Sequence, residues 1–283
     1  MYLTIPMKKT RQKVKSKKIL ALILTLIFIP TIVFSYSPVP DKKIKIAVTT
    51  SNLSTILNEI CKDKIDVITI IPTTMCPGSY DIDAKTIKEI NRCNIIIYHS
   101  SQAWVKNLKW ETTNLGLIFR ELKTKGNLMV PYVNLKAAQE LFELLSVWDQ
   151  KNKDFYEKNF LDYSFKVNFV ASEIAKNTTN KHNKKVVCNI RLSSFLEWLG
   201  FDVVATYGKS SNISSSEMLF LTKKIKKEKV KYVVDNLQVG TDVGRALSND
   251  LKIKHIVISN FALGNSYINT LKNNVEKIDK ALQ

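Results

Sequence analysis

The chain has 283 residues, with 43 Lys and Arg against 25 Asp and Glu and a formal net charge of +18. This length is too great for a single small module and suits two domains that each have their own core. The positive charge alone would allow a nucleic-acid-binding protein, but the lysines are scattered and no nucleic-acid motif accompanies them, so we expect no nucleic-acid partner.

Residues 1–35 have the pattern of a secretory signal peptide. A basic run from Lys8 to Lys18 is followed by the apolar run Ile19–Phe34, which would span about 24 Å as a helix, less than the roughly 30 Å of a hydrocarbon core. Val33-Phe34-Ser35 offers cleavage after Ser35. An N-terminal anchor that stays uncleaved is the alternative, whereas a lipid anchor lacks its cysteine, because none precedes Cys61. We expect secretion across the cytoplasmic membrane, to the periplasm or the outer face of that membrane.

The next part of the chain alternates apolar strands with amphipathic helices. Strands are predicted at Lys43–Val48, Val67–Ile71 and Ile95–Tyr98, and helices at Leu53–Cys61 and Ile82–Asn91. Continuous apolar runs are typical of strands buried on both faces of a parallel sheet. A polar segment follows each strand: Thr49–Asn52, the turn Cys76–Tyr80 and His99–Gln102.

The middle of the chain predicts helices, and the strand pattern then restarts. One helical stripe runs from Leu135 to Leu145, and Phe155–Ala175 has no Pro or Gly, which indicates one long helix. Further strands are predicted at Lys185–Cys188, Asp202–Ala205, Lys231–Val234 and Ile253–Ile258, and further helices at Leu192–Leu199, Glu217–Lys229, Asp242–Leu251 and Tyr267–Leu282.

These elements predict an α/β fold with two lobes, each with a mostly parallel sheet flanked by helices. We expect an N-terminal lobe at residues 36–150, one long linking helix at 151–182 and a C-terminal lobe at 183–283. A cleft between the lobes then lies at the carboxyl ends of strands, where α/β proteins bind small ligands.

Four cysteines follow the leader: Cys61, Cys76, Cys93 and Cys188. An even number permits two disulfides in an oxidising compartment, although no CxxC pair is present. Cys93 and Cys188 adjoin apolar strand patterns and are expected to be buried thiols. Only Cys76 lies in a turn of functional interest.

From Lys43 to Leu282, the order of elements and several local strings resemble the solute-binding proteins of ABC transporters for zinc and manganese. Members of that family carry a DPHxY turn, a PHVWLDP segment, a strand ending in TH and a final DP turn, whose three histidines and carboxylate bind the metal. This chain has CPGSY at the first motif, with Gly78 in place of histidine, or Ser79 if the register shifts by one; Pro77 and Tyr80 are kept. Tyr132 falls at the second histidine, Asn189 at the third, and Asn260 at the carboxylate.

All four metal positions are therefore substituted. Zinc and manganese sites use imidazole and carboxylate ligands, and neutral amides are weak ligands for either ion. The resemblance thus implies a cleft whose lining forms hydrogen bonds, with bare-ion binding disfavoured. The predicted ligand-binding residues are Gly78, Ser79, Tyr80, Tyr132, Asn189, Arg191 and Asn260.

Two further groups of residues suggest other ligand chemistry. Arg191 can pair with a carboxylate or phosphate, which would suit a small anion or a metal carried by an anionic chelator; a surface arginine beside Glu197 is the alternative. A relocated metal site built from Cys76, His99 and Asp81 is the second hypothesis, against an inert thiol and an ordinary polar histidine. His182 is expected in a loop and His255 as a packed side chain.

The resemblance implies an extracytoplasmic, monomeric solute-binding component of an ABC transporter. It would capture its ligand in the inter-lobe cleft and pass it to a membrane permease. The ligand would be zinc, manganese or a metal chelate. No GxSxG, HExxH or phosphate-binding glycine loop is present, and we expect no enzyme activity. The alternatives are a surface adhesin or partner-binding protein on the same fold and, more remotely, an enzyme that uses Cys76 and His99.

Overall fold

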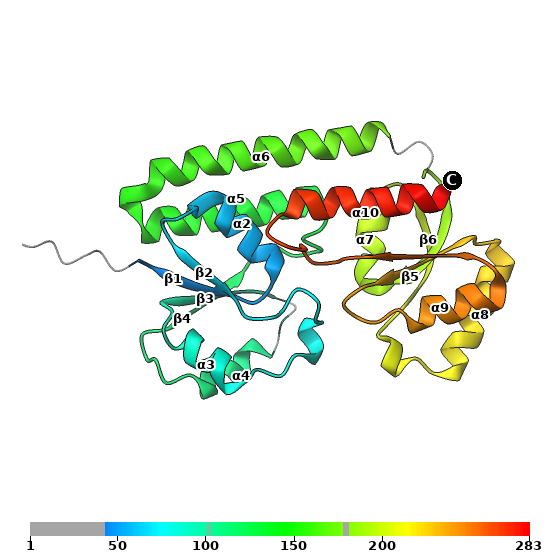
Figure 1. Ribbon diagram of the computed structural model, residues 1–283, viewed down its shortest axis with the longest axis horizontal. Helices are drawn as coiled ribbons and strands as arrows, with labels where there is room; N and C mark the ends of the chain where they lie inside the picture. The colour runs from blue at the N-terminus through cyan, green and yellow to red at the C-terminus, as the bar shows by residue number, and fades with distance from the viewer. Residues whose placement is uncertain (1–42, 101, 103, 178–180) are drawn as a thin grey trace, which may run out of the picture. The chain divides into compact units, whose positions relative to one another are not determined.

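The computed structural model of the chain describes residues 43–100, 102, 104–177 and 181–283 and contains two four-stranded sheets in which all strands are parallel (Figure 1). The predicted signal or anchor segment, residues 1–35, lies outside the described residues. Within the described ranges, no helix combines the length and hydropathy needed to cross a bilayer.

The N-terminal lobe contains a sheet with the order β2-β1-β3-β4. Its strands are β1 (Lys45–Val48), β2 (Asp66–Thr69), β3 (Ile95–His99) and β4 (Ile118–Leu122). Ile46 of β1 pairs with Val67 on one side and Ile95 on the other, so the most apolar strands lie in the centre. The C-terminal lobe repeats this design with the order β6-β5-β7-β8. Its strands are β5 (Lys185–Asn189), β6 (Asp202–Tyr207), β7 (Tyr232–Asn236) and β8 (Lys254–Ile258).

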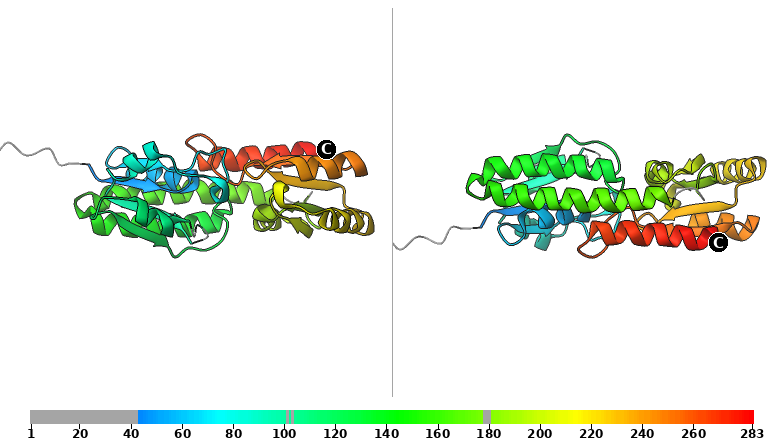
Figure 2. Two further views of the ribbon diagram at one scale, coloured as in Figure 1. Left: turned by 90° about the horizontal axis from the view of Figure 1, so that it is seen from below. Right: turned by 90° about the horizontal axis from the view of Figure 1, so that it is seen from above.

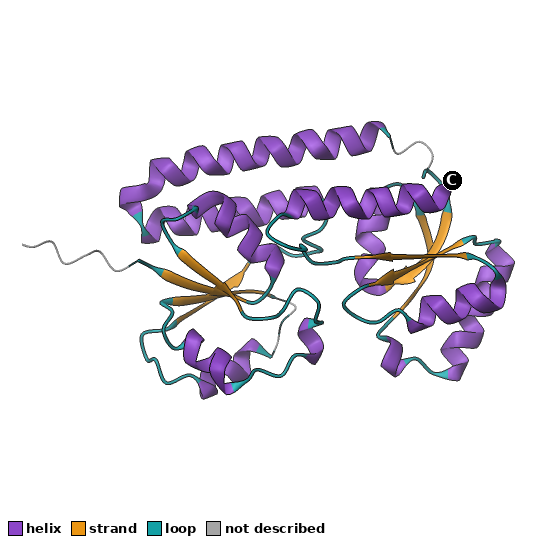
Figure 3. Cartoon of the chain, viewed as in Figure 1, coloured by secondary structure: helices purple, strands orange, loops and turns teal. Residues whose placement is uncertain are grey.

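Helices cover both sheets (Figure 3). The N-terminal lobe has α2 (Ser51–Cys61), α3 (Ala84–Ile90) and α4 (Val105–Glu111), and two longer helices follow, α5 (Pro131–Trp148) and α6 (Lys153–Lys176). The C-terminal lobe has α7 (Ser193–Trp198), α8 (Ser215–Glu228), α9 (Asp242–Leu251) and α10 (Tyr267–Leu282). Short 3₁₀ turns occur at Pro77–Ser79, Gln150–Asn152, Ile190–Leu192 and Ser210–Asn212. The predicted two-lobe α/β fold is confirmed.

The predicted linking helix corresponds to α6, which packs against α5 along the same side of the protein (Figure 2). Near its start, the amide of Asn159 donates to the carbonyl of Ile60 in α2 at 3.0 Å. Just beyond its end, the fully buried Lys181 pairs with Asp279 of α10 at 2.6 Å. The helix therefore contacts the N-terminal lobe at one end and leads to the C-terminal lobe at the other.

One hydrophobic core runs through both lobes. It contains Ile46 and Ile95 of the first sheet, Leu141 of α5, Val167 of α6 and Phe195 of α7. Separate clusters pack the opposite face of each sheet, one against α3 and α4 and the other against α8 and α9. Because the shared core spans the boundary, opening the lobes widely would expose apolar surface.

Two elements were not indicated by the sequence. Strand β4 is the edge of its sheet, and Ile118, Arg120 and Glu121 within it are exposed, so no buried apolar run marks it. Helix α4 has only seven residues, of which Val105 and Leu108 are buried. Periodicity is informative over longer segments, and both elements are too short for it.

Local hydrogen bonds shift two helix starts from their predicted positions. The carboxylate of Asp83 accepts from the amide of Thr86 at 2.7 Å, so α3 begins at Ala84 rather than Ile82. Ser214 and Glu217 form a capping box, so α8 begins at Ser215 and Glu217 is already within its first turn.

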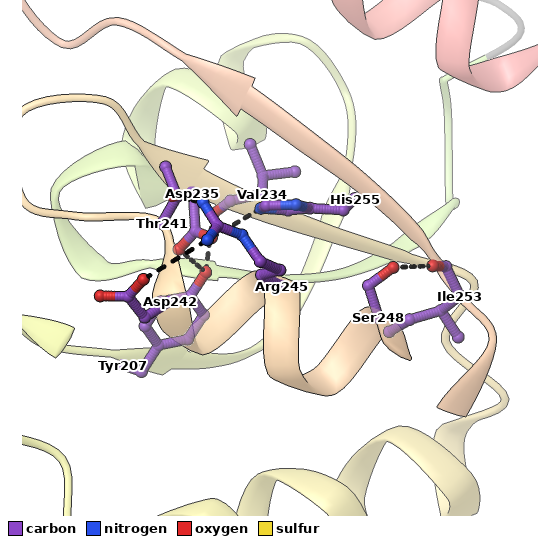
Figure 4. A network of polar contacts seen from close by, with 9 residues as sticks. All are labelled: Tyr207, Val234, Asp235, Thr241, Asp242, Arg245, Ser248, Ile253 and His255. Carbon is purple, nitrogen blue, oxygen red and sulfur yellow. Dashed lines mark hydrogen bonds and ion pairs between the residues drawn. The ribbon is translucent and has the colours of Figure 1, made fainter. Parts of the chain in front are cut away.

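A buried polar network joins three strands of the second sheet and lies against α9 (Figure 4). The fully buried Asp235 accepts a hydrogen bond from the Tyr207 hydroxyl at 2.6 Å and lies 2.7 Å from Nε2 of His255. Burial and the Asp235 carboxylate raise the pKa of Tyr207 well above its usual value, so the phenol remains a donor. Gly244 of α9 faces this network: a Cβ there would lie 2.2 Å from Oδ2 of Asp235.

We expect Gly244→Ala to destabilise the fold by about 1–3 kcal/mol, because the added methyl group must displace a buried carboxylate. In an ordinary helix interior the same change stabilises by up to roughly 1 kcal/mol, so the sign is diagnostic. Urea unfolding measures it. Gly208→Ala is the matched control, since a Cβ at position 208 meets no atom within 4 Å. Equal stability of the Gly244 variant and the control would contradict the packing described.

Candidate functional site

A cavity of about 710 Å³ lies between the two lobes, at the carboxyl ends of strands from both sheets. The N-terminal lobe lines it with the segments that follow β1, β2, β3 and β4, and the C-terminal lobe with those that follow β5, β7 and β8. Parallel sheets direct these loops to a common edge, which is where α/β folds bind ligands. A volume of this order suits a small organic molecule and far exceeds that of a single metal ion.

Three asparagines join the lobes at this cavity. Nδ2 of Asn127 donates to the Arg191 carbonyl at 2.9 Å and to Oδ1 of Asn260 at 2.8 Å. Asn52 donates to the Asn260 carbonyl at 3.1 Å and accepts from the Ala262 amide at 2.7 Å. Four hydrogen bonds thus cross from one lobe to the other beside the cavity.

Gln238 and Tyr267 add two contacts of the same kind. Nε2 of Gln238 donates to the Thr73 carbonyl at 3.0 Å, while its oxygen accepts from the Asn260 amide at 3.1 Å. The buried hydroxyl of Tyr267 donates to the Met129 carbonyl at 3.0 Å. The loop that carries Asn260 is therefore held both within its own lobe and against the other.

The hydrogen bonds determine which way three cavity carboxamides point. Oδ1 of Asn127 accepts from the Met129 amide at 2.8 Å, so its nitrogen is the atom that donates to Asn260. Asn260 must then present Oδ1 to Asn127, which leaves its Nδ2 toward other partners. The oxygen of Gln102 accepts from the Thr49 hydroxyl and from the His99 amide, and that of Asn236 accepts from the Gln238 amide at 3.0 Å.

The side-chain nitrogens of Gln102, Asn236 and Asn260 consequently have no acceptor among the described residues. All three residues line the cavity, and Gln102 and Asn236 are 5% and 1% exposed. A buried N–H group without an acceptor is unfavourable, so these nitrogens are available for a ligand or for water.

Two cations line the cavity from opposite lobes, Lys125 in the loop after β4 and Arg191 after β5. Neither forms an ion pair with a described residue, and the alternative in which Arg191 pairs with Glu197 is not found. Glu121 is the carboxylate of the lining; together with burial, it raises the pKa of the neighbouring Tyr98. Burial lowers the pKa of His99, which favours its neutral form.

Five residues predicted from the sequence line this cavity: Cys76, Gly78, His99, Arg191 and Asn260. Asn189 instead lines a smaller adjoining pocket of about 210 Å³, which it shares with Arg191. Both polar atoms of its side chain form hydrogen bonds within the protein. The oxygen accepts from the Arg191 amide at 3.1 Å, and the nitrogen donates to the Gly208 carbonyl at 2.9 Å.

Three of the other predicted residues are absent from the cavity lining. Tyr80 packs against the core of the N-terminal lobe, with its hydroxyl 3.4 Å from that of Thr86. Tyr132 is 58% exposed at the start of α5, beside the ammonium group of Lys136. Asp81 is exposed and outside the lining, and the side chain of Ser79 lies outside the described part of the structure.

The structure places Asn127, rather than Tyr132, opposite Asn260. Pro131 occupies the first turn of α5, so Tyr132 is already helical and points away from the cavity lining. The loop before the helix turns toward the other lobe four residues earlier, at Asn127. The correspondence expected for Tyr132 at the second motif thus shifts to Asn127 in three dimensions.

No three His, Cys, Asp or Glu side chains within the described ranges come together as a group that could hold a metal ion. Cys76 and His99 both line the cavity, but Asp81 does not. The proposed Cys76, His99 and Asp81 cluster is therefore not assembled in this structure.

Sequence reasoning missed Gln102, Lys125, Asn127 and Asn236 as site residues. Gln102 ends the polar run after the third predicted strand, and Asn236 lies two residues beyond the predicted strand Lys231–Val234, so strand ends were a usable signal for both. Lys125 and Asn127 follow β4, the strand that the sequence did not indicate.

What this arrangement supports chemically is reversible binding. It combines amide donors, two cations and the apolar groups Trp104, Leu128, Ile190 and Phe261 around one cavity.

Comparison with known proteins identifies related chains. A family model described as "Zinc-uptake complex component A periplasmic" matches residues 131–281. The manganese ABC transporter substrate-binding lipoprotein PsaA of Streptococcus mitis is 25% identical over 278 residues, which covers 85% of this chain and 90% of the relative.

Solved structures show the same fold. The SBP FpvC of Pseudomonas aeruginosa, in complex with Mn²⁺, matches with a TM-score of 0.75 and 16% identity over 86% of this chain and 99% of that one. A mutant of the laminin-binding adhesin Lmb of Streptococcus agalactiae matches with a TM-score of 0.74 and 17% identity over 85% of this chain and 100% of that one.

Only one of the four thiols should react in the folded protein. All four cysteines are unpaired; Cys61, Cys93 and Cys188 are buried, which raises the pKa of the first two to about 11 and of Cys188 to about 12. Cys76 is half-buried in the cavity lining. We expect a thiol reagent at neutral pH to label one site per chain, at Cys76, and four sites after unfolding. Labelling that persists in Cys76→Ala would contradict this.

Acidification should destabilise the fold partly through His99. Because burial lowers the pKa of His99 in the folded protein, the unfolded chain takes up a proton first as the pH falls below about 6.5. Stability is therefore lost as the pH falls through the window between 6.5 and the lower folded pKa. The drop in thermal midpoint between about pH 8 and pH 5.5 should be smaller in His99→Gln than in the original protein. An identical drop in both would show that His99 does not contribute.

Proposed function

The chain belongs to the family of the periplasmic zinc-uptake complex component A, and from this premise we propose that it is the solute-binding component of an ABC importer whose solute is not a bare metal ion. The solute occupies the inter-lobe cavity and is passed to a permease in the membrane. This chemistry is reversible binding and requires no catalytic residue.

The observation that carries the proposal is the cavity itself. About 710 Å³ of space, lined by both lobes at the strand ends, is a ligand site by position and size. Residues at or after the ends of seven of the eight strands line the cavity, so both sheets contribute to this one site.

The residues around the cavity argue against a bare transition-metal ion. A zinc site needs about four imidazole, thiolate or carboxylate ligands within coordination distance. In the described structure no group of three such side chains exists, and Asn127 and Asn260 use their amides to bind each other. A cation would also meet the N–H faces of Gln102, Asn236 and Asn260, whose oxygens are turned to the protein. The solute that fits is a small organic molecule, or a metal enclosed in one.

PsaA is named as the substrate-binding lipoprotein of a manganese ABC transporter. For the reasons above, we do not assign the free manganese ion to this chain as its solute. We propose that the importer role is retained while the ligand has changed. The protein then acts outside the cytoplasmic membrane, with a membrane permease as partner.

Two alternatives receive less support. The resemblance to the adhesin Lmb, at 17% identity, shows the fold alone. Lmb is described as a bifunctional protein with adhesin and metal-transporting activity, so an adhesin role would come in addition to solute binding. The family and the relatives found are transport components, which disfavours an enzyme based on Cys76 and His99.

The proposal predicts that the protein holds a small molecule and not a free metal. Native mass spectrometry of protein purified without added ligand should show a non-covalent adduct heavier than a single metal ion. Equilibrium dialysis of the stripped protein against Zn²⁺ and Mn²⁺ should leave the metal content, measured by elemental analysis, well below one ion per chain. The thermal midpoint should also stay unchanged, because only a ligand of the folded state raises it.

Stoichiometric binding of either free ion would refute the claim about the ligand. A protein that carries no adduct and also fails to stimulate ATP hydrolysis by its permease–ATPase complex would instead support the adhesin alternative. As a control, Gly208→Ala should behave as the original protein, since its added methyl group meets nothing.

A further inference from the structure

We propose that the cavity recognises a small organic anion with at least two carboxylate groups, bound by Lys125 and Arg191 from opposite lobes and by the amide nitrogens of Gln102, Asn236 and Asn260. This assignment rests on the proposed solute-binding function and adds to it the chemical class of the solute and the residues that select it.

The first support is that the free carboxamide atoms of the cavity are donors. Gln102, Asn236 and Asn260 each commit their oxygen to a protein donor, at 3.1, 3.0 and 2.8 Å. Their nitrogens have no acceptor among the described residues. Three donors on one cavity favour a ligand rich in acceptor oxygens, and carboxylates are common organic groups that accept without donating.

Burial makes this arrangement specific. Asn236 is 1% and Gln102 is 5% exposed, so the surrounding protein holds both side chains in place at the cavity wall. A ligand with a donor in that place would leave the N–H groups unpaired, which is the strongest penalty that a polar site imposes. The site therefore excludes polyamines and other cations as well as selecting oxyanions.

The second support is the position of the two cations. Lys125 lies two residues before Asn127, and Asn127 donates to the carbonyl of Arg191 at 2.9 Å. The two cation-bearing loops are thus in contact across the lobe boundary, and neither side chain has a carboxylate partner in the described structure. Arginine can bind a carboxylate through two parallel hydrogen bonds, and lysine adds a point charge.

Charge and shape define the rest of the ligand. The lining contains two positive side chains, Lys125 and Arg191, and one negative side chain, Glu121, so its net charge is positive by one. Trp104, Leu128, Ile190 and Phe261 provide apolar surface that an inorganic oxyanion would not fill. The cavity volume of about 710 Å³ agrees with an organic skeleton, either free or folded around a chelated metal.

The test uses named probes on the purified, metal-free protein. Citrate and malate are the anionic probes, inorganic phosphate the small-anion probe, and spermidine and glucose the cationic and neutral probes. Isothermal titration gives the affinity, and protection of Cys76 from thiol labelling reports occupancy of the cavity that it lines. Citrate or malate should bind and protect, spermidine and glucose should not, and added salt should weaken binding.

Variants assign the binding to the named residues. Arg191→Gln and Lys125→Gln should each weaken citrate binding about tenfold to a hundredfold, the cost of one charge-assisted hydrogen bond. Lys123→Gln is the matched control, since this lysine lies on the same loop but outside the lining. Asn260→Asp keeps the acceptor for Asn127 and replaces the free donor by a carboxylate, so it should also weaken citrate.

The outcomes separate the two proposals. Failure of all three anionic probes to bind, or equal losses in Lys123→Gln and Lys125→Gln, would overturn the anion assignment. A co-purified adduct that proves cationic or neutral would overturn it too, yet would leave the solute-binding function standing. Absence of both adduct and probe binding would defeat both. Binding of phosphate as tightly as citrate would reduce the site to a simple oxyanion site and refute the organic class.

Discussion

The carboxamide of Asn127 donates from the N-terminal lobe to two acceptors of the C-terminal lobe, and its own oxygen is held by the Met129 amide. Because both ends of this group are used, it can take one orientation only. That orientation decides which atom of Asn260 faces Asn127 and therefore which atom remains for a ligand. Arg191 is positioned by the same group, through its carbonyl. The orientation of Asn260, and with it one of the three free amide nitrogens of the cavity, follows from this one side chain.

Hydrogen bonds and a shared hydrophobic core join the two lobes. Asn52, Asn127, Gln238 and Tyr267 all hydrogen bond across the boundary, and the core that contains Leu141 and Val167 is continuous between the lobes. A metal ion that joins residues of both lobes would supply such contacts in another way. Here amide groups make contacts of that kind between the lobes.

The substitutions at the four motif positions are consistent with one another. An imidazole or carboxylate presents an acceptor to a cation, whereas Asn260 presents an N–H group because its oxygen is held by Asn127, and Gln102 and Asn236 of the same cavity do likewise. Replacing one ligand would leave a weak metal site, but replacing all of them and adding Lys125 and Arg191 reverses the polarity that the solute meets. The same fold can in this way serve an importer for a different class of solute.

The sequence by itself determined the two-lobe α/β architecture and the strand ends that carry Gly78, His99, Arg191 and Asn260, because buried parallel strands are long apolar runs bounded by polar residues. It also determined that the usual metal ligands are absent, since residue identity needs no coordinates. Only the tertiary structure decided that Asn127, not Tyr132, faces Asn260. It also decided that the side-chain oxygen of Asn189 accepts a hydrogen bond from the Arg191 amide in the same turn. The orientation of an amide depends on partners distant in the chain, Asn127 being 133 residues from Asn260. No local pattern encodes such a contact, and for that reason the donor character of the cavity could not be predicted from the sequence.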